Sequence, residues 1–382
     1  MPIWAILFLV AKQKNRQLEK NMALSFFRKA PQFWERRGPT SLLLWPLSWL
    51  YGVALRIRKL IHDLDLSKVK PAPVPIIIVG NIRVGGTGKT PIVIALAQQL
   101  SQLGWKPGII SRGYGASSQT SPLQVSSSSD PALVGDEPAL IAKRTGDQFP
   151  IWVFPKRQQS IKALLKHTPE VNVIISDDGL QHRGLIRWPA REGGRDIEFV
   201  VRDDRGEGNR FLLPAGPLRE PATRERDATL FTGTPKNQKS GILDEYFLGR
   251  RLFNLVSRLG TPYQLINTPK TQSFEQIAEQ FLPKNITAIA GLGNPKRFFN
   301  DLAKQGIAGK QIPLPDHATY TPEFFAAIKA ECILITEKDA VKCTGILDER
   351  IWVVPMSLHL PDNLMDWLQS ILQRPDPRRY TL

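Results

Sequence analysis

Apolar and polar positions follow a regular order from residue 74 onward. Short runs rich in Ile and Val, typical of buried strands, are separated by stretches in which apolar residues recur at helical spacing. The expected strands cover residues 75–79, 106–110, 151–154, 171–176 and 197–201. The expected helices between them cover residues 91–103, 137–145 and 158–166. This order predicts an α/β domain with a mostly parallel sheet and helices on both faces.

A second unit of the same kind begins near residue 285. Its expected strands cover residues 286–290, 311–314, 332–336 and 351–354, and its helices include 322–330 and 361–372. We therefore divide the chain into an N-terminal helical segment (1–70), a first α/β domain (71–245), a connector with short strands (246–284) and a second, smaller α/β domain (285–382). Within the first domain, residues 184–195 are expected to form a surface insertion.

The N-terminal segment contains a long stretch without charge, between Arg37 and Arg56. It is rich in Leu and Trp, is interrupted by Pro46, and leads into apolar residues at helical spacing with basic residues between them. The pattern favours a helix lying in a membrane interface, with Trp45 and Trp49 at the level of the lipid headgroups. The alternatives are a core helix of a soluble domain and a membrane span, which usually needs about 20 apolar residues.

Charge narrows the choice of partner. Residues 1–70 hold 13 Lys and Arg against 4 Asp and Glu, so more than half of the net charge of +16 lies beside apolar sequence. This favours an anionic membrane surface over nucleic acid, and no nucleic acid or obligate protein partner is expected. Two cysteines cannot form a metal cage alone, and the five histidines show no metal-ligand spacing.

The strongest motif follows the first expected strand. Residues 76–90 read as an apolar run, a glycine-rich turn and Gly-Lys-Thr, and a helical pattern comes next. Strand, glycine loop and helix in that order form a phosphate-binding loop, in which Lys89 reaches the outer phosphates and Thr90 is placed for Mg²⁺. The nucleotide-binding residues are expected to be Arg83, Val84, Gly85, Gly86, Thr87, Gly88, Lys89 and Thr90. The common spacing has glycine at position 83; a glycine-rich turn that binds nothing is the alternative.

Two carboxylates, Asp177 and Asp178, end the fourth expected strand. In a protein with a phosphate-binding loop, an acidic residue in this place holds Mg²⁺ directly or through water. A turn or a helix N-cap is the alternative. Gln181 and His182 continue the same turn and are assigned to the substrate.

Asp136 opens a helix, where a helix N-cap explains it without any function. Its position between a loop and a helix also suits a base that accepts a hydroxyl proton. His317 follows a strand of the second domain, and could tune such a base if it faced Asp136 across a cleft. A solvated turn is the alternative for His317.

Three further charged residues are candidates. Arg112 follows the second strand and could clamp a phosphate with two hydrogen bonds. Arg219 and Glu220 end a loop rich in proline, which is expected to be rigid and to present both side chains. Each of the three could equally be part of a charged turn.

These motifs together resemble the tetraacyldisaccharide 4′-kinase family, the lipid A 4′-kinases of Gram-negative bacteria. The matching residues are Val84-Gly-Gly-Thr-Gly-Lys-Thr90, Ser111-Arg-Gly-Tyr-Gly115, Gly135-Asp-Glu-Pro138, Asp177-Asp-Gly-Leu-Gln-His182, Leu213-Pro-Ala-Gly-Pro-Leu-Arg-Glu220, Asp316-His317 and Thr336-Glu-Lys-Asp339. Their order runs from about residue 36 to the C-terminus. The family also lacks the first glycine of the loop, which accounts for Arg83.

The resemblance implies ATP- and Mg²⁺-dependent phosphorylation of the 4′-hydroxyl of a lipid disaccharide at the cytoplasmic face of the inner membrane. It implies that Asp136 is the catalytic base, supported by His317, and that Lys89 serves the transferred phosphate. Asp177 and Asp178 would serve the metal site with Thr90, and Glu220 would join them. Arg112, Gln181, His182 and Arg219 would bind the substrate.

A membrane-associated switch ATPase of the deviant phosphate-loop type is the rival hypothesis. Such proteins carry a similar glycine loop and use ATP to control dimerisation. They have a lysine just before the Gly-Gly pair, where this chain has Val84.

Overall fold

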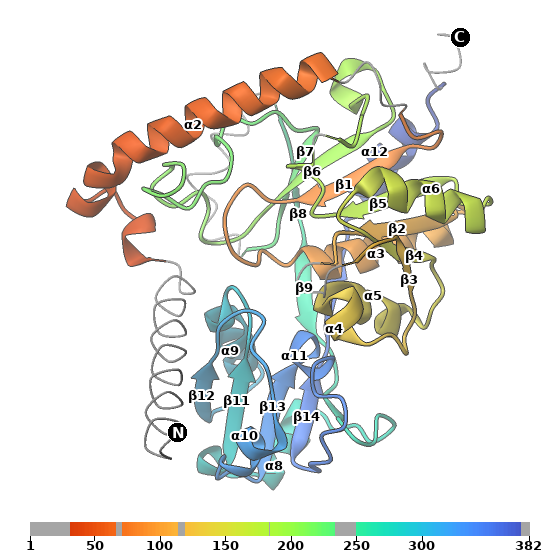
Figure 1. Ribbon diagram of the computed structural model, residues 1–382. Helices are drawn as coiled ribbons and strands as arrows, with labels where there is room; N and C mark the ends of the chain where they lie inside the picture. The colour runs from red at the N-terminus through yellow and green to blue at the C-terminus, as the bar shows by residue number, and fades with distance from the viewer. Residues whose placement is uncertain (1–30, 66–70, 114–118, 183, 234–249, 376–382) are drawn as a thin grey trace, which may run out of the picture.

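The computed structural model describes residues 31–65, 71–113, 119–182, 184–233 and 250–375. Figure 1 shows two lobes, each built around its own sheet, with the long helix α2 (Pro39–Asp65) lying across the upper lobe. The prediction of a larger and a smaller α/β unit is confirmed. Residues 1–30 of the expected N-terminal segment lie outside the described residues.

The upper lobe contains, among the described residues, an eight-stranded sheet. Its spatial order is β3 (Leu123–Val125), β4 (Ile151–Val153), β2 (Pro107–Ser111), β5 (Val173–Asp177), β1 (Ile76–Gly80), β6 (Ile197–Arg202), β7 (Ala228–Phe231) and β8 (Arg251–Asn254). All neighbouring strands are parallel except β3 and β4. The glycine loop leaves the centre of this sheet, because β1 lies between β5 and β6.

Side chains alternate between the two faces of β1, as the period of a strand requires. Ile77 and Val79 belong to the core on one face, whereas Ile76 and Ile78 belong to the core on the other. The helices that alternate with these strands along the chain are α3 (Lys89–Gln102), α4 (Pro131–Val134), α5 (Asp136–Thr145) and α6 (Arg157–His167). Since both faces are covered, the strands read as continuous apolar runs.

The lower lobe has a five-stranded sheet in the described part of the chain. Its order is β10 (Tyr263–Gln264), β14 (Ile351–Val354), β13 (Cys332–Thr336), β11 (Ile286–Ala290) and β12 (Lys310–Pro313). Its helices are α8 (Phe274–Gln280), α9 (Pro295–Lys304), α10 (Pro322–Ala326) and α11 (Glu337–Ala340). The strands β9 (Val256–Leu259) and β15 (Met356–His359) form a separate antiparallel pair. This pair occurs where the chain enters and leaves the lower lobe.

The structure corrects the expected domain division at the C-terminus. Helix α12 (Asp362–Leu372) was assigned to the second domain, but Leu364 and Leu368 are fully buried in the same core as Ile77 and Val79 of the upper sheet. The connector also differs, because β8 joins the upper sheet while β9 and β10 join two other sheets. The sequence pattern of a helix or strand shows that one face is apolar and will be buried, but it does not show which sheet that face packs against.

The stretch 184–195, expected as a surface insertion, packs inward. Leu185 and Ala190 are buried. The buried carboxylate of Asp196 accepts hydrogen bonds from the backbone N–H of Ile76, at 2.9 Å, and of Trp188, at 2.7 Å. The stretch is therefore tied to the start of β1.

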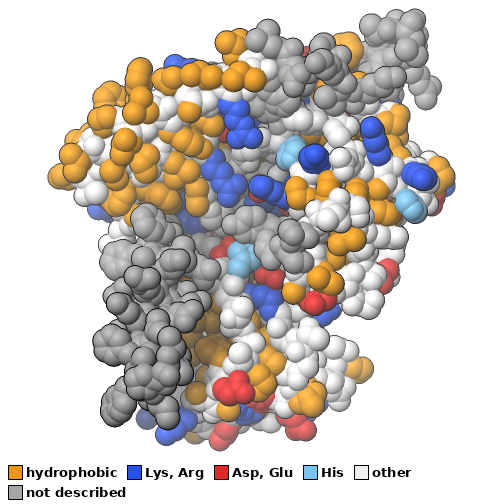
Figure 2. Space-filling view, in the orientation of Figure 1, with side chains coloured by type: hydrophobic (Ala, Val, Ile, Leu, Met, Phe, Trp, Pro, Cys, Tyr) orange, Lys and Arg blue, Asp and Glu red, His pale blue; other side chains and the backbone are white. Residues whose placement is uncertain are grey.

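Helix α2 turns its small polar residues inward and its large apolar residues outward. Ser48 is 3% exposed, and its hydroxyl donates to the carbonyl of Leu212 at 2.6 Å and accepts from the N–H of Ala215 at 2.9 Å. In contrast, Leu43 is 80% and Trp49 59% exposed. Figure 2 shows the resulting apolar surface along α2, with basic side chains beside it. This arrangement contradicts the core-helix alternative.

A search of the described helices finds none long and apolar enough to span a bilayer.

We predict that Leu368→Ala lowers the free energy of unfolding by about 2–5 kcal/mol, because it opens a cavity in the core of the upper lobe. Leu347→Ala is the matched control, since Leu347 is 87% exposed, and should change the value by less than about 0.5 kcal/mol. Urea unfolding measures both. Equal effects of the two substitutions would contradict the placement of α12.

Candidate active site

The glycine loop has the backbone of an anion-binding cradle. Gly85 and Gly88 have φ angles of 102° and 80°, in the left-handed region that favours glycine, and α3 begins directly after Gly88. The side-chain amide of Asn81 donates to the carbonyls of Arg83 at 2.7 Å and Gly85 at 3.0 Å. Asn81 thus fixes the entry of the loop, and the helix N-terminus behind it attracts negative charge.

A pocket opens between this loop and the lower lobe. The upper lobe contributes the loop from Gly86 to Pro91 together with Glu137. The lower lobe contributes the turn after β11 and the start of α9, including Asn294, Arg297 and Phe298. The pocket therefore joins a phosphate cradle to a partly apolar wall, as a nucleotide requires.

The two lobes touch at the glycine loop itself. A Cβ atom added to Gly293 would lie only 2.1 Å from the backbone nitrogen of Gly86, so position 293 has no room for a side chain. Arg205 holds this contact, because its guanidinium donates to the carbonyl of Gly86 at 2.5 Å and of Gly293 at 3.0 Å. Asp203 pairs with the same guanidinium at 2.6 Å.

Lys89 is nearly buried and points toward the carboxyl end of β5. Its ammonium lies 3.4 Å from the Asn81 side-chain oxygen and 3.5 Å from a carboxylate oxygen of Asp178. The predicted phosphate lysine is thus close to one of the two predicted metal carboxylates.

Asp177 is a buried carboxylate whose two oxygens have no hydrogen-bond partner among the described residues. Burial, with help from the negative charge of Glu137, raises its pKa to about 7, although Lys89 opposes the shift. An uncompensated buried carboxylate is costly unless a cation or donor completes the site. Beside Lys89 and Thr90, it fits a divalent cation carried with a nucleotide.

The remaining predicted metal ligands do not form one cluster. Glu220 turns to Arg224, at 2.7 Å, and Asp178 contacts Arg219 at 3.6 Å. No three His, Cys, Asp or Glu side chains in the described ranges are arranged to hold a metal by themselves. Glu220 stays a predicted metal ligand, because only one of its carboxylate oxygens pairs with Arg224 and the other is buried with no hydrogen-bond partner among the described residues.

Asp136 and His317 meet across the lobes. The Asp136 carboxylate lies 3.0 Å from Nδ1 of His317. The N-cap explanation for Asp136 fails, because Gly135 is the N-cap and Asp136 is the first residue of α5. His317 has a φ angle of 61°, a left-handed conformation that non-glycine residues adopt only when their surroundings hold them there.

A second ion pair spans the lobes next to this one. The Lys338 ammonium lies 3.1 Å from both Glu137 and Asp316, the neighbours of the two residues just described. Burial alone would raise the pKa of Glu137, but Lys338 and Lys89 outweigh it and lower the pKa to about 2. Arg144 of α5 also binds Glu337 at 2.8 Å. Glu137 and Lys338 lie in motifs quoted for the resemblance, but neither was assigned a role in the site, because each motif could equally be a charged turn.

Arg83 does not face the pocket. Its guanidinium pairs with Glu35 and donates to the carbonyls of Arg205 at 3.1 Å and Gly206 at 3.3 Å. A buried guanidinium needs such partners. The expected nucleotide contact of Arg83 is therefore corrected to a link between the loop and the N-terminal segment, while Val84 binds Pro217 through its backbone at 2.9 Å.

The predicted substrate residues gather around the turn after β5. Gln181 donates to the Asn81 carbonyl at 3.0 Å, and His182 contacts the Pro155 carbonyl at 2.8 Å. Burial lowers the pKa of His182. Arg112 is exposed, and its charge acts on both His182 and the fully buried Arg157. This edge is therefore basic, and none of its four predicted substrate residues lines the nucleotide pocket.

Comparison with known proteins decides the family. Residues 40–373 match the family described as Tetraacyldisaccharide-1-P 4′-kinase (LpxK). The chain belongs to this kinase family. Curated members include the tetraacyldisaccharide 4′-kinase of Polynucleobacter asymbioticus, which is 81% identical and aligns over 94% of this chain and 100% of its own. That of Herminiimonas arsenicoxydans is 44% identical over 90% and 94%.

A solved structure of the same kinase family agrees with the fold. The crystal structure of LpxK from Aquifex aeolicus in complex with ATP has a TM-score of 0.67 and 28% sequence identity, and the match covers 87% of this chain and 99% of that one. The predicted family and the predicted phosphate-loop α/β fold are therefore confirmed.

The kinase site also contains two residues, Asn81 and Arg205, that the sequence analysis did not assign to it. Asn81 lies inside a recognised motif, and its amide could have been assigned to the loop. Arg205 lies in a stretch of arginine and glycine that predicts no element, so only the fold reveals it.

We predict that, without bound ligand, the Asp177→Asn variant gains stability relative to the wild type as the pH rises from 3.8 to about 7. The folded-state pKa near 7 lies above the ordinary value of 3.8, so the unfolded chain loses this proton first and wild-type stability falls between these pH values. The fall is about 1.4 kcal/mol per pH unit at most. The stability difference between variant and wild type should grow through that interval and then level off. A difference independent of pH, measured by urea unfolding, would contradict the shift.

Proposed function

We propose that this protein transfers the γ-phosphoryl group of ATP to the 4′-hydroxyl of a tetraacyldisaccharide 1-phosphate lipid. The observation that carries the proposal is the 3.0 Å contact between Asp136 and His317 beside the glycine-loop pocket. A switch ATPase needs no such base for a sugar hydroxyl. The named relatives support the same substrate.

The donor side follows from the pocket. Backbone N–H groups of the glycine loop and the start of α3 cradle the phosphates, and Lys89 neutralises their charge. The wall from the lower lobe covers the nucleoside. Thr90, Asp177 and Asp178 would hold Mg²⁺, which supplies further neutralisation of the phosphates when it is bound.

The acceptor side uses the pair of residues between the lobes. Asp136 accepts the proton of the attacking hydroxyl, and His317 keeps the carboxylate oriented. Contact of the lobes through Arg205 and Lys338 excludes water, so that ATP is not merely hydrolysed. Arg112, Gln181, His182 and Arg219 line the basic edge where an anionic lipid head group would bind.

Helix α2 brings the enzyme to its substrate. Its outer face would enter the headgroup region of the membrane, while basic residues of the same segment meet anionic lipid. The cytoplasmic face of the inner membrane is the location that fits an ATP donor and a lipid acceptor.

We expect Asp136→Asn to lower the turnover number for the lipid by about 10²–10⁴-fold, because the amide cannot accept the proton. Binding of ATP should change by less than about twofold. Asp130→Asn is the matched control, because Asp130 is an exposed N-cap of α4. Steady-state transfer of phosphate to the lipid in detergent checks both. Near wild-type turnover of Asp136→Asn would rule out its role as the base.

A double variant, Leu43→Glu with Trp49→Glu, should weaken binding to vesicles of phosphatidylethanolamine and phosphatidylglycerol by at least about tenfold. The loss follows because two exposed apolar side chains of α2 no longer enter the bilayer. Leu347→Glu changes a leucine of the lower lobe that is even more exposed, at 87%, and this variant should bind as wild type does. Cosedimentation measures the three proteins, and unchanged binding of the double variant would contradict the proposed membrane face.

A further inference from the structure

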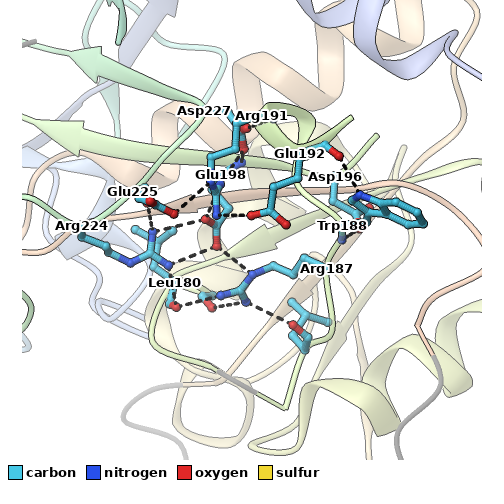
Figure 3. A network of polar contacts seen from close by, with 12 residues as sticks. Leu180, Arg187, Trp188, Arg191, Glu192, Asp196, Glu198, Arg224, Glu225 and Asp227 are labelled. Atoms are coloured by element: carbon cyan, nitrogen blue, oxygen red, sulfur yellow. Dashed lines mark hydrogen bonds and ion pairs between the residues drawn. The ribbon is translucent and has the colours of Figure 1, made fainter. Parts of the chain in front are cut away.

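A cluster of buried charged side chains lies next to the candidate active site, and the proposed mechanism gives none of them a direct role. Glu198 on β6 is 2% exposed, and three arginines surround its carboxylate. Arg187, Arg191 and Arg224 reach it at 2.8, 3.0 and 3.1 Å (Figure 3). Burial alone would raise the pKa of Glu198, but these guanidinium groups outweigh it and lower the pKa, so the carboxylate stays charged.

Stability alone gives no reason for this cluster. Removing buried charges from water offsets most of their attraction, so a buried ion cluster adds little net stability compared with apolar packing. What such a cluster supplies is fixed geometry, because a guanidinium presents its donors in a rigid plane. The other partners of these arginines therefore show what the cluster holds in place.

The other partners of Arg187 are carbonyls of the turn that follows Asp177 and Asp178. Arg187 donates to Leu180 at 3.1 Å and to His182 at 3.1 Å, and more weakly to Gly179 and Leu185 at 3.4 and 3.3 Å. These carbonyls converge on one guanidinium. The turn is thus held by a side chain from outside it.

Arg224 holds the same turn from another direction. It donates to the Leu180 carbonyl at 3.2 Å and pairs with Glu220 at 2.7 Å. The cluster therefore links the turn after β5 to the loop that carries Arg219, and both meet at Asp178.

The turn sets the position of groups at the glycine loop. It begins at Asp178, whose φ of 51° is left-handed and whose carboxylate lies 3.5 Å from Lys89. It also carries Gln181, whose amide binds the Asn81 carbonyl. Displacement of the turn would move both contacts.

We propose that Arg187, anchored by Glu198, is a positioning residue that holds the turn 178–182 against the phosphate-binding loop. The proposal rests on the proposed kinase function, because its consequence is the placement of Asp178, Gln181 and His182 for phosphoryl transfer. Arg187 does not itself touch the reacting groups.

Arg191 offers a matched control. It binds the same carboxylate of Glu198, so Arg191→Gln and Arg187→Gln each remove one of three guanidinium groups from the cluster. The other side-chain contacts of Arg191 among the described residues are to Glu192, Glu225 and Asp227, and not to the turn. Only Arg187→Gln should therefore release the turn.

The experiment compares full-length wild type, Arg187→Gln, Arg191→Gln and Arg187→Lys. Steady-state kinetics with tetraacyldisaccharide 1-phosphate should show kcat/KM for the lipid lowered about ten- to a hundredfold in Arg187→Gln, with the KM for ATP within about twofold. Arg187→Lys should remain defective, because an ammonium keeps the pair with Glu198 but cannot replace the planar fork. Arg191→Gln should keep both constants within about threefold of wild type.

Hydrogen exchange of the amides of residues 178–182 supplies a readout that does not depend on activity. Exchange should quicken by at least about tenfold in Arg187→Gln and stay near wild type in Arg191→Gln. Equal losses in the two glutamine variants, or recovery in Arg187→Lys, would overturn the positioning role in favour of general charge balance. If wild type fails to label the lipid while the exchange difference persists, the proposed function fails and the positioning role stands.

Discussion

The contact between Asp136 and His317 requires two lobes to be held in register, and much of the structure serves that requirement. The two residues lie 181 positions apart in sequence and in different lobes. Lys338 binds a carboxylate from each lobe, and Arg205 binds a backbone carbonyl from each. The lobes also touch without side chains at the glycine loop. In the proposed mechanism, the pair of Asp136 and His317 is complete only while the two lobes are in contact, which would couple proton acceptance to phosphate binding.

At the two places where the nucleotide and the membrane would bind, the protein has side chains that lack a favourable partner. The carboxylate of Asp177 is buried without a described partner beside Lys89, and the outer face of α2 exposes Leu43 and Trp49. Both features cost stability in the isolated protein. Local departures from good packing of this kind mark functional sites. The same physical argument, an uncompensated group, therefore supports both the proposed donor site and the proposed membrane face.

Local patterns in the sequence predicted the strands, the glycine loop and the acidic residues at strand ends, because periodicity and turn chemistry act within a few residues. Asp136 and His317 do lie in contact. The sequence offered this only as one of two options for His317, the other being a solvated turn, because the contact depends on how the two lobes are arranged. Long-range partners were not predictable: α12 packs on the upper sheet, Arg83 binds Glu35, and Glu220 pairs with Arg224. Charge and apolarity show that a side chain needs a partner, while only the fold determines which one it finds.

The fate of the terminal phosphate of ATP is the most direct measurement. Wild-type protein is incubated with γ-labelled ATP, Mg²⁺ and tetraacyldisaccharide 1-phosphate in detergent micelles, and label is counted in the lipid and in free phosphate. A base held between two closed lobes, beside a covered nucleotide, predicts that most of the label reaches the lipid as a 4′-phosphate. Label found only as free phosphate, with the lipid unchanged, would contradict it.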